Sequence, residues 1–194
     1  MAEQTVLVAI DIGTTKVCVL IGEVSRGGDV NIIGYGIAPS VGMKKGMVAN
    51  IDQTVNSIAA SLEKAERLSG YKISSAFVSV GGSHISSQNS RGVVAVSGHK
   101  REVSREDVAR ATEAAKAIQV PSNREILHVI PRGYIVDGQE GIKDPLGMSA
   151  VRLEVETHIV TASSTSVQNL TKCVQRAGVE IGRASCRERV SSVV

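Results

Sequence analysis

Two nearly continuous apolar runs open the chain, at residues 6–10 and 17–21, and a third apolar stretch follows at residues 30–37. The first two runs predict a β-hairpin with strands at residues 5–12 and 16–24, and the third predicts another strand after a glycine-rich turn. Because the runs are continuous rather than alternating, we expect a sheet that is covered on both faces.

A helical pattern begins after Asn50. Asn50 is a good helix cap, and Gln53 stands at the position that answers such a cap. Apolar residues then recur every three or four positions and predict one buried face, made of Ile51, Val55, Ile58, Leu62, Ala65 and Leu68. Gly70 ends this helix. Residues 76–80 predict a buried strand, so the first part of the chain has the order β-β-β-α-β.

The pattern becomes shorter and more polar after Gly82. We expect short strands at residues 83–88 and 93–96, followed by a helix that Ser104 caps together with Asp107. The inner face of that helix is predicted to hold Val108, Ala111, Ala115 and Ile118.

Strands are predicted next at residues 126–130 and 134–136, on either side of Pro131, and then a loop at residues 138–147. Residues 150–159 alternate and predict a half-exposed strand, with Val151, Leu153, Val155 and Thr157 inward. A last helix is predicted with Ser164 as its cap; it turns Val167, Leu170, Val174 and Ala177 inward and stops at Gly178.

Composition excludes several classes of function. The 194 residues are 42% hydrophobic and 21% charged, as in soluble globular proteins. With one Phe, three Tyr and no Trp, the chain lacks the aromatic residues that stack on single-stranded nucleic acid, and a net charge of +3 is too small to indicate a nucleic-acid partner. No apolar run reaches the roughly 18 residues of a membrane span, and no secretory signal is visible. Three distant cysteines predict reduced thiols in a cytoplasmic protein.

The last residues differ in character from the rest. The stretch 181–194 resembles the translation of a sequencing adapter, and we expect it to be a non-native tail; for fold prediction we set residues from Glu180 onward aside. The alternative is a genuine basic terminal helix or strand. Without the three arginines and one glutamate of the tail, the net charge falls from +3 to +1. The chain is then expected to be a fragment of a longer protein.

The strongest chemical signal is the turn between the first two strands, Asp11-Ile12-Gly13-Thr14-Thr15-Lys16. Gly13 lets the backbone approach an anion, and the backbone N–H groups and hydroxyls of Thr14 and Thr15 can bind phosphate oxygens. Lys16 adds a positive charge, and Asp11 can act on Mg²⁺ through metal-bound water. The alternative is a simple hairpin turn. Since the four histidines are not spaced as ligand pairs, we expect no direct metal ligation.

Wider stretches carry a family resemblance. The turn with its strands is similar to the first subdomain of the actin/Hsp70/sugar-kinase superfamily. Residues His128–Met148, Ser40–Gly46 and Val78–Ile85 resemble the FtsA family of bacterial cell-division proteins, and the resemblance covers about residues 5–179. It implies an α/β fold with an α+β insert: an actin-like, ribonuclease-H-type first subdomain at residues 1–82 and 162–180, and an inserted SHS2-like interaction module at residues 83–161.

This resemblance also implies a function. Members of the family bind ATP with Mg²⁺, form filaments, and tether the FtsZ ring to the inner face of the cytoplasmic membrane through a C-terminal helix that lies outside this chain. They also recruit later division proteins. For this chain we therefore expect an incomplete ATP site made of Asp11, Gly13, Thr14, Thr15 and Lys16, and no catalytic residues. The nucleotide would bias a conformational equilibrium rather than feed a reaction.

Two enzymatic alternatives remain within the superfamily. A small-molecule kinase would use the same phosphate-binding turn, but it also needs a catalytic carboxylate beside its substrate, and residues 81–161 offer no evident base. A chaperone ATPase is less favoured because the insert is of the FtsA type.

Overall fold

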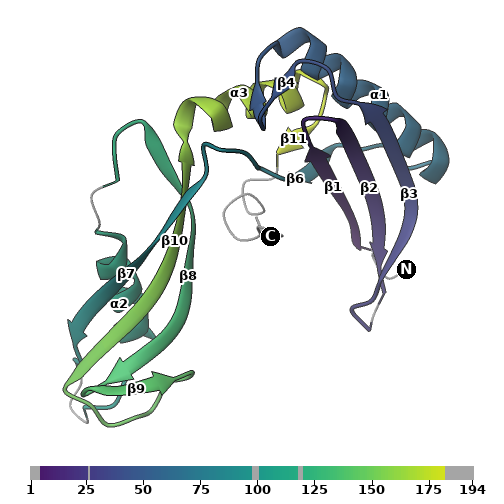
Figure 1. The fold of residues 1–194 in the computed structure, drawn as a ribbon. Helices are drawn as coiled ribbons and strands as arrows, with labels where there is room; N and C mark the ends of the chain where they lie inside the picture. The colour runs from purple at the N-terminus through teal and green to yellow at the C-terminus, as the bar shows by residue number, and fades with distance from the viewer. Residues whose placement is uncertain (1–4, 26, 98–100, 118–119, 182–194) are drawn as a thin grey trace. The chain divides into compact units, whose positions relative to one another are not determined.

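The chain folds into two compact units in the structure, a computed structural model that describes residues 5–25, 27–97, 101–117 and 120–181 (Figure 1). Unit 1 comprises the residues up to Ile85 and those from Ser163 onward, and unit 2 comprises Ser86–Ala162. The predicted boundaries, at 82/83 and 161/162, lie within three residues of these.

Unit 1 is built on a five-stranded sheet with the order β11-β6-β1-β2-β3. The first three strands are antiparallel neighbours, as the apolar runs predict, whereas β6 is parallel to β1 and β11 is parallel to β6. A small separate hairpin, β4–β5, precedes the first helix. The bounds are β1 Thr5–Ile12, β2 Lys16–Val24, β3 Val30–Pro39, β4 Met43–Lys44, β5 Met47–Val48, β6 Ser75–Val78 and β11 Glu180–Ile181.

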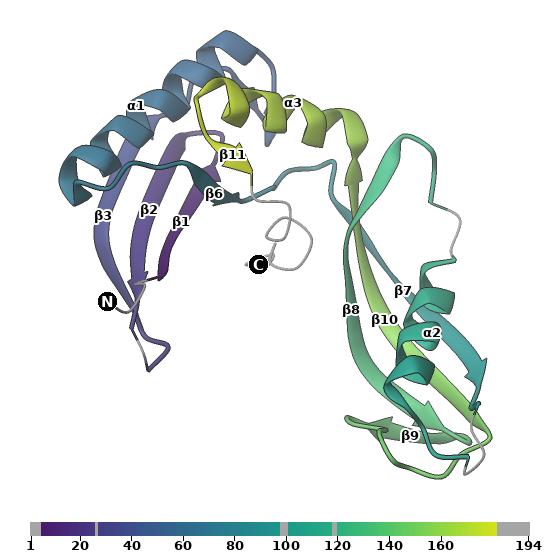
Figure 2. The ribbon, with the colours of Figure 1, turned by 180° about the vertical axis from the view of Figure 1, so that it is seen from behind.

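Helices α1 (Ile51–Ser69) and α3 (Ser164–Arg176) lie on the same face of this sheet (Figures 1 and 2). The predicted cap of α1 is confirmed, because the Asn50 side chain accepts a hydrogen bond from the Gln53 N–H at 3.0 Å. The N-cap of α3 is Ser163, one residue before the predicted one. The core between helices and sheet consists of aliphatic residues, among them Ile10, Val19, Ile58, Leu62 and Val174.

The inner face of α1 is more polar than its apolar spacing predicts. Gly36 of β3 allows the helix backbone to approach so closely that a Cβ there would lie 1.9 Å from the Ser61 carbonyl oxygen. The Ser61 hydroxyl donates to the Gly36 carbonyl at 2.8 Å. The helix is therefore turned toward its small residues, Thr54, Ser57 and Ser61, and the prediction that Leu68 is buried is wrong, since it is 58% exposed.

The opposite face of the unit 1 sheet is open, so the prediction of a sheet covered on both faces is wrong for the described residues. Leu20, Tyr35 and Ile37 point away from the helices and are 40%, 55% and 45% exposed. The strand register places Tyr35 opposite Leu20 and Ile37 opposite Cys18. This open face is consequently apolar.

Unit 2 is a four-stranded sheet with the order β7-β10-β8-β9 and one helix, α2. Helix α2 lies against one face of the sheet (Figure 2). Strands β7 and β10 pair along ten residues, from Ala95 opposite Arg152 to Ser86 opposite Thr161. The bounds are β7 Ser86–Ala95, α2 Arg105–Lys116, β8 Arg124–Val136, β9 Gln139–Ile142 and β10 Arg152–Ser163.

Three predictions for unit 2 need correction. Strand β7 is continuous, whereas two short strands were expected. Strand β8 runs through Pro131, which lies outside the stretch of β8 that pairs with β9. The expected loop at 138–147 contains β9, which follows a tight turn in which Asp137 and Gly138 both have positive φ, as Asp-Gly hairpin turns do.

The α2 cap is confirmed, with Ser104 and Asp107 forming a reciprocal capping box. Ala111 and Ala115 are buried as predicted, while Ile118 lies outside the described residues. A Cβ at Gly92 of β7 would lie 2.0 Å from the Ala111 carbonyl, so this strand glycine brings α2 close to the sheet.

The end of the described chain extends the unit 1 sheet. Glu180 and Ile181 form β11 beside β6, so setting residues aside from Glu180 onward removed a strand that belongs to the fold. The remaining residues of the predicted tail, 182–194, lie outside the described part. None of the described helices has the length and apolar composition that crossing a bilayer requires.

Candidate functional site

The predicted phosphate-binding turn is the tight connection between β1 and β2. The Gly13 N–H donates to the Lys16 carbonyl at 3.0 Å, and a Cβ at Gly13 would lie 3.0 Å from the same oxygen. Thr14, Thr15 and Lys16 are exposed. Of the five predicted site residues, four are therefore exposed, since Asp11 is exposed as well, and Gly13 is the residue at which the two sides of the turn come closest.

Asp11 is held by a residue from another strand connection. Its carboxylate is exposed and accepts a hydrogen bond of 2.5 Å from the Ser79 hydroxyl. The backbone supports this contact, because the Ser79 N–H donates to the Ile10 carbonyl at 2.9 Å just beyond the end of β6. One carboxylate oxygen is thus fixed by Ser79, and the other oxygen can accept from a water on a metal ion.

Thr14 is linked to the β4–β5 hairpin. Its hydroxyl oxygen accepts a hydrogen bond from the Gly46 N–H at 3.1 Å, so the hydroxyl proton remains available for an anionic oxygen. Gly46 has a φ of 77° and packs on Gly82, since a Cβ at Gly46 would lie 2.5 Å from the Gly82 Cα. Two segments far from the turn in sequence therefore support it.

A pocket of about 360 Å³ lies beside this hairpin in unit 1. Lys44 and Lys45 are exposed and line it together with Met47, Val48, Ala49, Ser166 and Asn169. Lys45 has a φ of 51°, which is uncommon outside glycine. The hairpin that contacts Thr14 thus also carries two cations.

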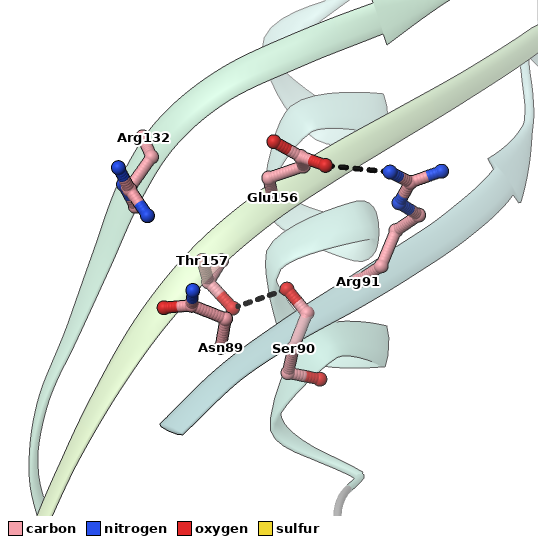
Figure 3. A pocket seen from close by; sticks show the side chains of 6 residues that line it. All are labelled: Asn89, Ser90, Arg91, Arg132, Glu156 and Thr157. Carbon is pink, nitrogen blue, oxygen red and sulfur yellow. Dashed lines mark hydrogen bonds and ion pairs between the residues drawn. The ribbon is translucent and has the colours of Figure 1, made fainter. Parts of the chain in front are cut away.

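A second pocket, of about 200 Å³, lies in unit 2, with Arg132, Glu156 and Arg91 on three neighbouring strands (Figure 3). Glu156 points toward Arg91, and their charged groups are 2.6 Å apart. The hydrogen bond that Arg91 donates to Glu156 raises the pKa of Arg91 above its ordinary value. Thr157, also lining this pocket, donates to the Ser90 carbonyl at 3.1 Å.

The same sheet carries a buried carboxylate, Glu154. Its side chain is only 5% exposed, lies 3.4 Å from the Arg91 guanidinium, and is also paired with Arg152. These residues and His158, whose Nδ1 lies 2.8 Å from the Asn89 side-chain oxygen, occupy the face of the sheet that α2 does not cover. His128 is buried, and desolvation lowers its pKa.

Sequence reasoning missed Ser79 and Gly46, the two residues that contact the turn from elsewhere. Gly46 lies in a segment that already contributed to the family resemblance, but no local pattern indicates its contact with Thr14. Ser79 lies inside the strand predicted at residues 76–80, just beyond the end of β6, and only the parallel pairing of β6 with β1 brings it to Asp11.

Comparison with known proteins shows which family this chain resembles. Residues 82–161 match a family model described as the SHS2 domain inserted in FTSA. A solved structure titled PilM-PilN type IV pilus biogenesis complex shares the fold, with a TM-score of 0.60 and 14% identity over 92% of this chain and 46% of that one. The predicted fold class, an actin-like subdomain with an inserted module, is thereby confirmed.

Curated relatives extend over both units. Proteins named Cell division protein FtsA are 48% identical in Borreliella burgdorferi, over 92% of this chain, and 45% identical in Pseudomonas aeruginosa and in Bacillus subtilis, over 90% and 93% of it. The chain spans about two fifths of the length of these relatives, between 41% and 43%. On these similarities, the chain belongs to the FtsA family of cell-division proteins.

Proposed function

We propose that this chain carries one half of the ATP site of an actin-like division protein that tethers the FtsZ ring to the inner face of the cytoplasmic membrane and recruits later division proteins. The similarity to the FtsA relatives supports this role. The single structural observation in its favour is the Asp11–Lys16 turn, whose carboxylate and threonine hydroxyl are each fixed by a neighbouring segment.

The turn fits a phosphate group with Mg²⁺. Gly13 leaves room for close backbone approach, Thr14 and Thr15 offer hydroxyl donors, and Lys16 offers a positive charge. Asp11, held by Ser79, would orient water on the metal ion. The nucleotide supplies negative charge that draws these groups together. Since no catalytic group is proposed, nucleotide binding would favour one conformation over another and so act as a switch for assembly, not as an enzymatic reaction.

Nucleotide binding is tested in the longer parent protein with Lys16→Ala, and with Lys72→Ala as the matched control. Lys16 lies in the turn, whereas Lys72 pairs with Glu66 on the surface. We expect Lys16→Ala to weaken Mg·ATP binding by about tenfold or more, because a charge-assisted contact is lost, and Lys72→Ala to leave it unchanged. Equal affinities for both variants, measured by calorimetry, would contradict the assignment of the turn.

The isolated 194-residue chain should bind ATP weaker by orders of magnitude than the parent, because only one side of the proposed site is present. Micromolar ATP binding by the chain alone would refute the half-site.

Tethering is tested by sedimentation of the parent with FtsZ and anionic vesicles. FtsZ should pellet with vesicles only when the parent is present. If FtsZ stays in the supernatant while the parent phosphorylates a small substrate, the alternative of a kinase from the same superfamily replaces this proposal.

A further inference from the structure

We propose that the outer edge of β7 binds an extended, acidic segment of a partner protein, which adds to the unit 2 sheet as a fifth strand. This proposal gives the proposed recruitment of division proteins a place on the molecule, and its test requires neither nucleotide nor FtsZ. It starts from the hydrogen bonds of β7.

Within the described residues, β7 pairs with β10 alone and so forms one edge of the sheet. Its even-numbered residues turn their backbone toward β10: the Val96 N–H just beyond the strand donates to the Val151 carbonyl at 2.9 Å, and the Ser90 carbonyl accepts from Thr157. Antiparallel ladders alternate, so the odd-numbered residues direct their backbone groups away from β10. These residues are Ser87, Asn89, Arg91 and Val93, and we call their outward backbone groups the free edge of β7.

The two edges of the sheet differ in how they are protected. On the other side, β9 has only four residues, a register irregularity beside it, and Gly141 with a φ of 79°, and the part of β8 that extends beyond β9 contains Pro131, which has no N–H. Short and irregular edges discourage strand addition. Strand β7 has ten residues in regular register and contains no proline. Arg110 of α2 contacts it at one outward carbonyl, that of Ala95, at 3.0 Å, which lies beyond the free edge.

The charged side chains around β7 favour an acidic partner segment. Arg91 lies on the uncovered face and Arg110 on the α2 side, and each side chain is about half exposed, at 50% and 48%. Their acidic partners Glu154 and Asp107 are 5% and 0% exposed, whereas Glu156, the nearer partner of Arg91, is 48% exposed. Arg152 and Arg132 on the two next strands are exposed as well, so exposed cations outnumber exposed carboxylates around β7. Strand β7 itself carries no acidic residue. Arginines at an interface favour carboxylates, and backbone pairing gives the affinity in strand addition.

A second copy of the chain fits this edge less well. In an antiparallel pair of two β7 edges centred on Arg91, the two arginines would stand directly opposite each other, and like charges in that position are destabilising. An acidic segment places opposite charge there instead.

The test uses the 194-residue chain and a seven-residue peptide of alternating valine and glutamate, with amide hydrogen exchange followed by NMR. Exchange of the outward amides of Asn89, Arg91 and Val93 should slow on peptide addition, whereas the amides of Ser90 and Gly92, already bonded to β10, should change little. A lysine analogue of the peptide should bind more weakly. Methylation of alternate peptide nitrogens should abolish the protection, and this control leaves the protein unchanged.

Two substitutions at Val93 test whether the backbone N–H groups of the free edge bind the peptide. Val93→Pro removes one outward N–H, and it should weaken peptide binding about fivefold to tenfold, while Val93→Thr, which keeps the N–H, should not. Three results would overturn the proposal: peptide binding that shifts only side chains of the Figure 3 pocket, equal binding of the glutamate and lysine peptides, or protection of the free edge that rises with protein concentration without peptide.

Discussion

In both units a helix packs closely on one face of the sheet, but the two units differ on the opposite, uncovered face of the sheet. In each, a glycine on a strand lets a helix backbone come close: Gly36 meets Ser61 in unit 1, and Gly92 meets Ala111 in unit 2. The uncovered face carries exposed apolar side chains in unit 1, whereas in unit 2 it carries ion pairs between arginine and glutamate side chains. Unit 2 therefore presents a face suited to water, whereas unit 1 presents one that is suited to a further layer of protein.

The largest effects are expected at the two glycines. Gly36→Ala and Gly92→Ala would each place a Cβ within about 2 Å of a helix carbonyl, at 1.9 and 2.0 Å, so the helix must move. Each should lower the free energy of unfolding by about 3 kcal/mol or more. Urea denaturation with hydrogen exchange should locate the loss in the unit that carries the change. The control is Gly133→Ala, whose Cβ would lie 3.9 Å from its neighbour; a loss there equal to that of Gly36→Ala would argue against close approach as the cause.

Acid should affect unit 2 more than unit 1. Burial alone would raise the pKa of the Asp107 carboxyl, but hydrogen bonds from Ser104, Arg110 and Ser97 outweigh burial and hold it below its ordinary value of 3.8. The folded state then stays ionised while the unfolded state takes up a proton, so stability is full above the ordinary value and is lost as pH falls below it. The corresponding cap of α1, Asn50, does not titrate.

Asp107→Asn separates this effect from general acid sensitivity. The variant should be less stable at neutral pH by about 2 kcal/mol, because hydrogen bonds to a charged group are worth about that much, and its stability should fall less steeply between about pH 5 and 3. Thermal unfolding followed by circular dichroism gives both quantities. An unchanged pH profile would show that the carboxylate of Asp107 does not link stability to pH.

A smaller effect is expected on self-association. Tyr35→Glu should weaken association of the chain about tenfold, because it removes a large side chain from the apolar face of unit 1. Ile130→Glu, at an apolar position of unit 2 that is 46% exposed against 55% for Tyr35, should change association less. Sedimentation equilibrium measures both. If the two changes had equal effects, the difference between the two open faces would not govern association.

The smallest effect concerns the α1 cap. Asn50→Ala should lower the free energy of unfolding by about 1 kcal/mol, because the Gln53 N–H loses its acceptor. Asn56→Ala, at an exposed position inside the same helix, should be neutral or slightly stabilising, since alanine has the higher helix propensity. Chemical denaturation followed by the circular dichroism signal of helices measures the free energy of unfolding of both variants.

Local chemistry could be predicted from the sequence wherever partners are close along the chain. The caps at Asn50 and Ser104 and the first hairpin are confirmed for that reason. Apolar periodicity missed the serine-lined face of α1, because that face depends on Gly36 in another element. The Asp137-Gly138 pair did carry a hairpin signal, which our assignment of a loop overlooked.

The candidate site divides in the same way. The turn itself lies within six consecutive residues and could be recognised from them. Its supports, Ser79 and Gly46, come from 68 and 32 residues away, and only the folded chain brings them to Asp11 and Thr14.

The pairing of Ser86 with Thr161 has a consequence for how such a protein can change. Adjacent strands lie about 4.8 Å apart, so the two ends of unit 2, where the chain leaves unit 1 and returns to it, lie next to each other. From the standpoint of unit 1, the module is a single long loop whose ends are already tied together, and its length adds little entropic cost to closing the chain around it. The insert can therefore be exchanged, lengthened or shortened as a cassette, while the turn at Asp11 stays as it is.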